Sequence, residues 1–345
     1  MLEIASHWTR VPGYLDTPSY GLPARATADA LRTAVDAWQS GTLDLAVIDR
    51  AVERMRAAYA TLVGAAPADV AFAASTSQVV GMVAASLPDG ARVVVADGDF
   101  ASVCFPFFAD PRLDVKVVPL ERIVAETRPG VDLVAVSAVQ SSDGRVADLT
   151  GLAMAARVGG VRTLVDASHA AGWLPLHARD FDVVVSSAYK WLTTPRGIAL
   201  AAIHPDATWI RPVSASWYGA DSPWESLYGP EMNLSRSARR LDTSPPWQLV
   251  EAGATALELL VAQGVDSIYR HSVGLANAFR ERVGLTASTS AIVAVDGVDP
   301  SALRAAGIRA SARGGRARMG FYLYNDMADV DAAARAVLAR VPQPA

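Results

Sequence analysis

One lysine stands in a predicted turn between two runs of strand-forming apolar residues. In the stretch FDVVVSSAYKWLTTPRGIALAAI, residues 181–203, Lys190 separates FDVVVSS from GIALAAI. A buried amine in such a turn has a chemical use, because desolvation and cationic neighbours lower its pKa and the neutral amine can then attack a carbonyl group to form a Schiff base. Lys190 is therefore a candidate nucleophile.

Other polar groups also follow predicted strands. Hydroxyl groups stand at residues 75–77, a carboxylate at Asp166, an imidazole at His169, and further polar side chains at 97–102 and 140–143. In open α/β sheets, ligands bind beyond the carboxyl ends of the strands, and the start of the helix after Ser75 favours an anion. The cofactor that needs a lysine imine, a carboxylate paired with a pyridinium nitrogen and a phosphate cup is pyridoxal phosphate.

The elements that must position these groups form an α/β layer. Apolar runs predict strands at residues 69–75, 91–97, 114–120, 131–139, 161–167, 181–187 and 197–203. Residues 76–90 and 149–160 show helical spacing and end at Gly. Only residues 188–196 separate the last two strands, too few for a helical crossover, so one of them is expected to be antiparallel. The predicted fold class is a doubly wound α/β layer with about seven strands.

The pattern changes after Asp206. Residues 214–230 are rich in aromatic and turn residues and predict a long surface-crossing segment, whereas 245–264 predict a long helix. Beyond residue 265, helices alternate with short strands, expected within 286–297 and 316–325. We expect a large domain at 12–245 and a small α+β domain at 246–345, with residues 1–11 packing against the small one.

Composition narrows the choice of partners. The 345 residues are 51% hydrophobic and 19% charged, with a formal net charge of −4 and no long basic run, so a small molecule is a better expected partner than nucleic acid. The first residues resemble no secretion signal, and no apolar run is long enough for a membrane span, which predicts a cytoplasmic protein. Cys104 is the one cysteine, so an internal disulfide and a cysteine-based metal cluster are excluded, and no metal is expected.

Several segments together resemble one enzyme family. VDASHAAG, residues 165–172, followed by SSAYKWLTTPRG, residues 186–197, is similar to the class V aminotransferase family. These fold type I pyridoxal phosphate enzymes include cysteine desulfurases, isopenicillin N epimerase-like proteins, kynureninases and ergothioneine-pathway C–S lyases. Residues 14–23, 99–107 and 309–331 resemble the family's substrate-side, cofactor-stacking and C-terminal segments, so the resemblance covers most of the chain.

The resemblance implies catalytic and cofactor-binding roles. Lys190 would form the Schiff base and later carry the Cα proton, Asp166 would keep the pyridine nitrogen protonated, and His169 would contact the region of the cofactor's 3-oxygen. Further cofactor contacts are implied for Thr76, Ser77 and Ser187 at the phosphate, Phe100 on the ring face, and Gln140 and Tyr189, the last as in kynureninases.

The resemblance also implies how substrate and a second subunit are bound. Arg313 is the first choice for the substrate α-carboxylate because an arginine fork matches a carboxylate bidentately, and Arg318 is its rival. Tyr20 lies in the substrate-side segment. Thr243 or Ser244 would reach the phosphate in the neighbouring subunit, which makes the expected protein a homodimer.

The resemblance indicates the cofactor more clearly than it indicates the type of reaction. Cysteine desulfurases need a nucleophilic cysteine on a C-terminal loop, and Cys104 is not in one. The resemblance places C–S β-elimination on a cysteine conjugate or sulfoxide slightly ahead of transamination or epimerisation, although TT before PRG departs from the Gly of many relatives. SAYK alone lacks the S-D-N and K-T-G partners of penicillin-recognising enzymes, and no G-x-G-x-x-G indicates a nicotinamide enzyme. A non-catalytic protein that keeps the fold stays open.

Overall fold

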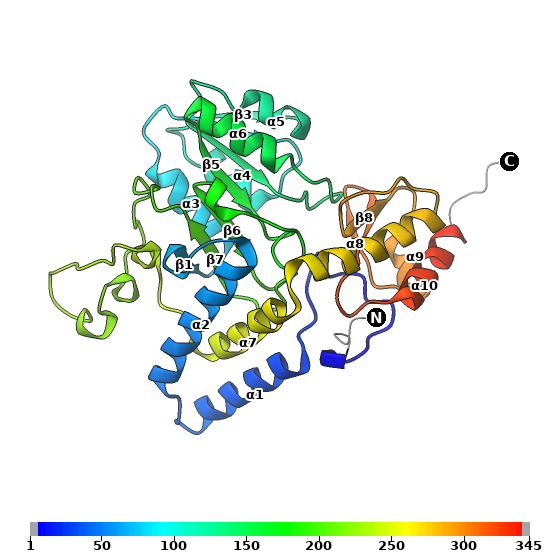
Figure 1. Ribbon diagram of the computed structural model, residues 1–345, viewed down its shortest axis with the longest axis horizontal. Coiled ribbons are helices and arrows are strands. Elements are labelled where there is room, and N and C mark those ends of the chain that lie inside the picture. The colour runs from blue at the N-terminus through cyan, green and yellow to red at the C-terminus, as the bar shows by residue number, and fades with distance from the viewer. Residues whose placement is uncertain (1–5, 340–345) are drawn as a thin grey trace.

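The computed structural model describes residues 6–339, so the packing expected for residues 1–5 lies outside the described part. One sheet of seven strands dominates it, in the order β1-β7-β6-β5-β4-β2-β3 (Figure 1). The strands are β1 Val70–Ala73, β2 Arg92–Ala96, β3 Asp114–Val118, β4 Leu133–Ser137, β5 Arg162–Asp166, β6 Val183–Ser187 and β7 Ala199–Ile203. Each lies within its predicted range, and β7, antiparallel to β1 and β6, is the expected exception in an otherwise parallel sheet.

The central strands are apolar throughout because they are covered on both faces. Along β4, Val134 and Val136 join one buried cluster while Leu133 and Ala135 join the other. Helices α2 (Leu45–Val63) and α6 (Leu149–Gly159) contribute to the first cluster. Helices α3 (Thr76–Ser86) and α4 (Ala101–Phe108) contribute to the second. This arrangement is the doubly wound layer that the sequence predicts.

The two predicted helices end for different reasons. Helix α6 is followed by Gly160 in the left-handed conformation, with a φ of 63°, as predicted. Helix α3 ends at Ser86, before the predicted stop at Gly90. The residue before a proline is disfavoured in the helical region, and Leu87, which precedes Pro88, is extended, so the proline and not the glycine sets this end.

The segment that leaves β7 crosses the surface without long elements. Its regular parts are short 3-10 turns at Trp217–Gly219, Pro223–Glu225 and Ala238–Leu241, and in Figure 1 it extends away from the sheet. The predicted long helix follows as α7 (Trp247–Gln263), which packs against α2 and α1 (Arg25–Gln39). A short helix, α5 (Ile123–Glu126), lies between β3 and β4.

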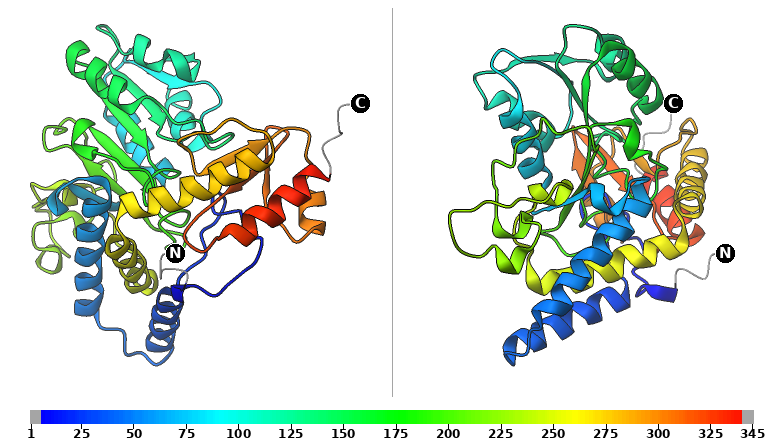
Figure 2. Two further views of the ribbon diagram at one scale, coloured as in Figure 1. Left: turned by 45° about the vertical axis from the view of Figure 1, so that its right-hand side comes forward. Right: turned by 60° about the vertical axis from the view of Figure 1, so that its left-hand side comes forward.

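A second, three-stranded antiparallel sheet has the order β8-β10-β9. Its elements are α8 Val265–Arg282, β8 Ile292–Val295, α9 Pro300–Ala305, β9 Ser311–Arg313, β10 Arg316–Gly320 and α10 Met327–Leu338. The N-terminal segment lies beside it (Figure 2): Gly320 N–H donates to the Leu15 carbonyl at 2.8 Å, and Arg10 forms ion pairs with Asp326 and Asp329. The domain division at residue 245 stays a prediction. Within residues 6–339, no helix is long and apolar enough to cross a membrane.

Candidate active site

The predicted site residues after the parallel strands meet at one edge of the large sheet. Because β7 alone is reversed, the carboxyl ends of β1, β2, β4, β5 and β6 share this edge. The chain must also fit the N-terminal segment closely against Lys190: Gly21 N–H donates to the Tyr189 carbonyl at 3.0 Å, and a Cβ on Gly21 would collide with the Lys190 carbonyl oxygen. Gly21 therefore allows the substrate-side segment to lie on the lysine turn.

Lys190 is buried at this edge, with 6% of its surface exposed. Its Nζ lies 3.0 Å from His169 Nε2 and 5.2 Å from the centre of the Phe100 ring, and it forms no ion pair with a residue of the described chain. Burial lowers the pKa of the Lys190 amine to about 8; Asp166 opposes this shift, whereas the guanidinium groups of Arg318 and Arg313 add to it. About a tenth of the amine is therefore neutral at pH 7, far more than for an ordinary lysine.

His169 is held by two indoles. Trp173 Nε1 donates to the His169 carbonyl at 2.7 Å, and Trp191 Nε1 points at His169 Nδ1 at 3.4 Å. Burial and the charge of Lys190 lower the pKa of His169 well below its ordinary value, so the ring is neutral. With the indole N–H directed at Nδ1, the favoured tautomer carries its proton on Nε2, which can donate to the lone pair of a neutral Lys190 amine.

Asp166 ends β5 opposite Ser137 of β4. The carboxylate is buried, and its Oδ1 accepts the Ser168 backbone N–H at 2.8 Å. Burial raises the pKa of Asp166, although Ser168 and Lys190 oppose the shift. A buried carboxyl group of this kind is stabilised in its charged form by a cationic partner. A protonated ring nitrogen would be such a partner.

Three hydroxyl groups gather at the first turn of α3. Thr76 Oγ1 lies 2.8 Å from Ser187 Oγ and 3.2 Å from Ser168 Oγ, and the Ser187 backbone N–H donates to Ser168 Oγ at 2.8 Å. We call Thr76, Ser168 and Ser187 the hydroxyl cup. Ser168 was missed by the sequence interpretation, although its place between Asp166 and His169 was a usable signal. Ser77 is exposed and makes no hydrogen bond to the cup.

Gln140 and Phe100 lie on the other side of Lys190. Gln140 is fully buried, and its Nε2 donates to Asp99 Oδ2 at 3.3 Å while its Oε1 has no hydrogen-bond partner in the described chain. Asp99 is fixed in turn by the backbone N–H groups of Ser137 and Phe100, each at 2.7 Å. The Phe100 ring is 42% exposed. The unpartnered Gln140 Oε1 and the exposed Phe100 ring are groups that a planar ligand bound beside Lys190 would contact.

Two arginines face the site from the small sheet. Arg318 is 1% exposed, and its donors reach Ser141 O, Ser311 Oγ and Ser19 Oγ at 2.6, 3.1 and 2.9 Å. Arg313 is half-buried, and its Nη2 donates to the same Ser19 Oγ at 3.4 Å. Neither guanidinium forms an ion pair with a residue between 6 and 339. Burial lowers the pKa of Arg318 to about 10, and the charge of Arg313 adds to this effect.

Two aromatic residues and the crossing segment complete the predicted set. The Tyr20 ring, 45% exposed, lies 6.1 Å from the Tyr189 ring, over which the Arg196 guanidinium stands at 4.9 Å. Thr243 and the exposed Ser244 follow Asp242, a buried carboxylate that accepts the Phe72 backbone N–H at 2.7 Å and pairs with Arg56. This anchor, which sequence reasoning did not identify, fixes the end of the crossing segment. The contact of Thr243 or Ser244 with a second subunit stays a prediction.

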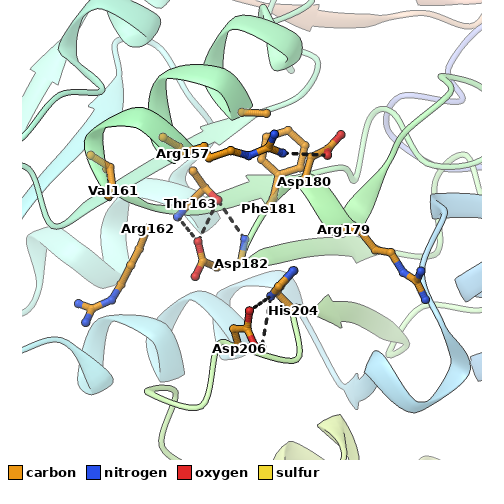
Figure 3. A pocket seen from close by; sticks show the side chains of 13 residues that line it. Arg157, Val161, Arg162, Thr163, Arg179, Asp180, Phe181, Asp182, His204 and Asp206 are labelled. Carbon is orange, nitrogen blue, oxygen red and sulfur yellow. Dashed lines mark hydrogen bonds and ion pairs between the residues drawn. The ribbon is translucent and has the colours of Figure 1, made fainter.

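A separate pocket lies at the opposite edge of the sheet, where β5 and β6 begin (Figure 3). Several of its polar groups lie close to one another: the Thr163 N–H donates to Asp182 Oδ2 at 2.9 Å, Arg157 lies 3.9 Å from Asp180, and His204 lies 3.7 Å from Asp206. None of the predicted site residues lines this pocket. It is therefore distinct from the lysine site.

Two further features test other chemistries. Cys104 is buried in α4, and burial raises the pKa of its thiol to about 12, so it is a poor nucleophile. Among residues 6–339, no cluster of three or more His, Cys, Asp or Glu side chains is placed to hold a metal ion.

Comparison with known proteins agrees with this geometry. The sequence profile named Aminotransferase class-V matches residues 37–297. YcbU of Bacillus subtilis, described as an uncharacterized aminotransferase, is 30% identical over 232 residues, which are 64% of this chain and 61% of that protein. A kynureninase of Stenotrophomonas maltophilia is 30% identical over 47% of this chain and 39% of its own length. An isopenicillin N epimerase of Amycolatopsis lactamdurans is 28% identical over 56% and 59%. The chain thus matches less than two thirds of the length of each.

Solved structures share the whole fold. The cystine C–S lyase C-DES, solved with cysteine persulfide, superposes with a TM-score of 0.83 at 17% identity and covers 94% of this chain and 97% of its own. The cysteine desulfurase CsdA of Escherichia coli gives 0.81 at 19% identity, covering 96% and 95%. The predictions of the family, the fold class and a pyridoxal phosphate-dependent enzyme are confirmed. The chain belongs to the class V aminotransferase family of fold type I pyridoxal phosphate enzymes.

Proposed function

We propose that this protein acts on an L-amino acid derivative and cleaves the C–S bond of a cysteine conjugate or sulfoxide by β-elimination. One observation carries the proposal: a buried lysine amine with a pKa of about 8 lies at the same sheet edge as a hydroxyl cup, and its pKa is lowered by two arginines that form no ion pair among residues 6–339. The amine can bind the cofactor covalently and carry a proton, the cup can bind a phosphate, and an arginine can bind a carboxylate. These are the three requirements of an amino-acid site built on pyridoxal phosphate.

The residues present fit that cofactor. The cup hydroxyls and the first-turn N–H groups of α3 suit the phosphate, Asp166 suits the pyridinium nitrogen, the open face of Phe100 suits the ring, and the unpartnered Gln140 Oε1 can accept from a donor on cofactor or substrate. When bound, the cofactor supplies an electrophilic carbonyl carbon and a protonated ring that accepts the electrons of a broken Cα–H bond.

The chain's own groups then divide the work. Lys190 in its neutral form is the nucleophile and, after release, the base for the Cα proton, because its lowered pKa keeps the amine ready to accept one near neutral pH. His169 positions that amine through its Nε2 at 3.0 Å. Arg318 is fully buried, and its charge lowers the pKa of Lys190 more than that of Arg313 does, so it is the proposed partner of the substrate α-carboxylate in preference to the more exposed Arg313.

Elimination is favoured over two neighbouring reactions. A desulfurase mechanism needs an accessible thiolate, and Cys104 is buried with a raised pKa. The Tyr189-Lys190-Trp191 run and the following PRG support a C–S lyase by their resemblance. Transamination is the second candidate, supported by the likeness to YcbU.

Product analysis separates the two. The holoenzyme is incubated with a cysteine conjugate and no keto acid; continuous release of pyruvate and ammonia is expected for the lyase. Activity that stops after one turnover and resumes only when a keto acid is added would reject elimination and support transamination. A purified protein that develops no visible cofactor band after addition of pyridoxal phosphate would reject both, and would favour a non-catalytic protein. The homodimer and the cytoplasmic location also stay predictions.

A further inference from the structure

Two positively charged side chains of the small sheet share one neutral acceptor. Arg318 and Arg313 both donate to Ser19 Oγ, at 2.9 and 3.4 Å, so their guanidinium groups are close neighbours. The other acceptors of this pair are neutral as well: Ser141 and Ser311 for Arg318, and the Ala312 carbonyl for Arg313. Two like charges held together around a hydroxyl group repel each other, and an anion between or beside them removes that repulsion.

The same hairpin shows that this is not the ordinary condition of its arginines. Arg316, opposite Arg313 in the β9–β10 register, pairs with Asp296 at 2.8 Å and lies 3.8 Å from Asp143. Among residues 6–339 the buried Arg280 has no carboxylate partner either, but it donates to the carbonyl oxygens of Ser290 and Ile292 at 2.9 and 2.7 Å and so joins two separate stretches of backbone. Arg313 forms no ion pair in the described chain, and its one backbone acceptor is the carbonyl of its neighbour Ala312.

The free donors exceed what one carboxylate takes. An arginine has five N–H groups, and Arg318 uses four of them on Ser311, Ser141 and Ser19. Arg313 uses two, on Ala312 and Ser19, which leaves three N–H groups without a hydrogen-bond partner among residues 6–339. A bidentate carboxylate takes two N–H donors. Arg318 therefore has one N–H left for one oxygen of a first carboxylate, and the three of Arg313 can serve a second anionic group.

The burial of the two arginines indicates which of them binds the α-carboxylate and which binds the second anionic group. Arg318 is 1% exposed, whereas Arg313 is only half-buried at the turn of the hairpin. The α-carboxylate is attached to the carbon that must lie next to Lys190, so it belongs on the deeper arginine. A group at the far end of the side chain points outward to Arg313.

We infer that Arg313 is a specificity-determining residue that binds a side-chain carboxylate, so that the preferred substrate is an acidic amino acid derivative with two carboxylates. This inference rests on the proposed function and adds the substrate class. Ser19 positions both guanidinium groups and can donate its own O–H to either carboxylate.

The test uses two probes of the same shape and different charge. S-(carboxymethyl)-L-cysteine and S-(carbamoylmethyl)-L-cysteine differ in one carboxylate against one amide. Their dissociation constants for the holoenzyme are measured by titration calorimetry and by the change in the visible band of the cofactor. The wild type is expected to bind the carboxylate probe about tenfold more tightly, as for one charge-assisted contact. A second carboxylate and amide pair, each longer by one methylene group, tests whether Arg313 binds a carboxylate further from the Cα atom.

Three variants locate the effect. In Arg313→Gln the two probes are expected to bind about equally well, because only the charged probe loses a partner. Arg313→Lys should keep part of the preference for the carboxylate probe. Arg316→Gln removes a paired arginine from the same hairpin and should keep the full wild-type preference. Thermal unfolding of each variant confirms that the hairpin stays folded.

The outcomes are separable. Wild-type holoenzyme that binds both members of each pair equally well, or an Arg313→Gln variant that weakens both equally, overturns the inference and leaves the proposed function standing. Wild-type protein that takes up no pyridoxal phosphate overturns the proposed function and the inference with it.

Discussion

The two lysines of the chain lie in opposite surroundings. Lys116, in the edge strand β3, is 53% exposed at its side chain and pairs with Glu126 at 2.7 Å. Lys190 is 6% exposed, has a neutral imidazole as its nearest polar neighbour, and forms no ion pair within the described chain. The same side chain is thus a surface charge in one place and, with its pKa lowered to about 8, a nucleophile in the other. Position in the sheet, not residue type, makes the difference.

The two edges of the sheet repeat this contrast. At the edge where β5 and β6 begin, several charged groups of the pocket in Figure 3 have a partner within the pocket: Asp182 accepts from Thr163, Arg157 lies near Asp180, and His204 lies near Asp206. At the carboxyl edge, Lys190, Asp166 and Arg318 are buried and none forms an ion pair with residues 6–339. Buried charges are normally paired. The carboxyl edge is therefore the one that a charged ligand completes.

The largest effect on turnover is expected from replacing each of the two lysines with alanine in turn. Lys190→Ala should lower turnover by about 1,000-fold or more because nucleophile and base are lost together. Lys116→Ala should leave turnover unchanged and cost no more than about 1 kcal/mol of stability. Steady-state assays of both variants test the contrast. Full turnover in Lys190→Ala would break it.

Asp166→Asn should have the next largest effect. An amide cannot hold the ring nitrogen protonated, so turnover is expected to fall by about 100-fold while the cofactor still binds. The visible band measures binding and a turnover assay measures the rate. Equal rates in variant and wild type would exclude Asp166 from the ring nitrogen.

A pair of threonines compares the two sheet edges directly. Thr76→Val removes a hydroxyl of the cup and should weaken binding of pyridoxal phosphate about tenfold. Thr163→Val removes a buried hydroxyl that binds Asp182 at the other edge and should lower stability by about 1 kcal/mol without changing cofactor affinity. Cofactor titrations and urea unfolding separate the effects. A weaker cofactor affinity in Thr163→Val alone would reverse the assignment of the edges.

The pKa of Lys190 sets a pH dependence. Because burial lowers this pKa from 10.5 to about 8, the amine loses its proton about two pH units below an ordinary lysine. The rate of cofactor attachment to the apoprotein should reach half of its maximum near pH 8 and level off about one unit above that. A stopped-flow series that kept rising to pH 10 would show an unshifted amine.

The smallest effect concerns the turn after Lys190. Thr193 has a φ of 53°, a left-handed conformation that is costly for a β-branched residue. Thr193 and Thr194 are both buried, so replacing either with Gly removes a packed side chain and adds chain entropy. Thr193→Gly also relieves the backbone strain and should therefore lower the free energy of unfolding by about 1 kcal/mol less than Thr194→Gly, at a residue without a positive φ. Urea unfolding of both variants is the measurement, and equal losses would mean that the turn carries no strain.

The sheet could be predicted because its strands are buried on both faces. Runs such as residues 131–139 leave no other interpretation, and the short link at 188–196 already indicated that one strand is reversed. The end of α3 was predicted wrongly because a glycine was given more weight than the proline before it. The attachment of residues 10–16 to the small sheet depends on contacts with residues about 300 positions away, which no local pattern contains.

The site was predicted in part for the same reason. Residues that directly follow strands, such as Asp166 and Lys190, could be placed at one edge by topology alone. Ser168, between Asp166 and His169, could have been placed there in the same way. Ser19 could not be, because its importance lies in which side chains it joins. The anchoring of Asp242 by Arg56 and β1 also appears only in three dimensions.

The most direct test is to find which lysine reacts. The protein is incubated with pyridoxal phosphate, reduced with borohydride, digested and mapped by mass spectrometry. One cofactor mass is expected on the peptide that contains Lys190 and none on the peptide that contains Lys116. Protein that stays unlabelled, or that is labelled at Lys116, would contradict the account.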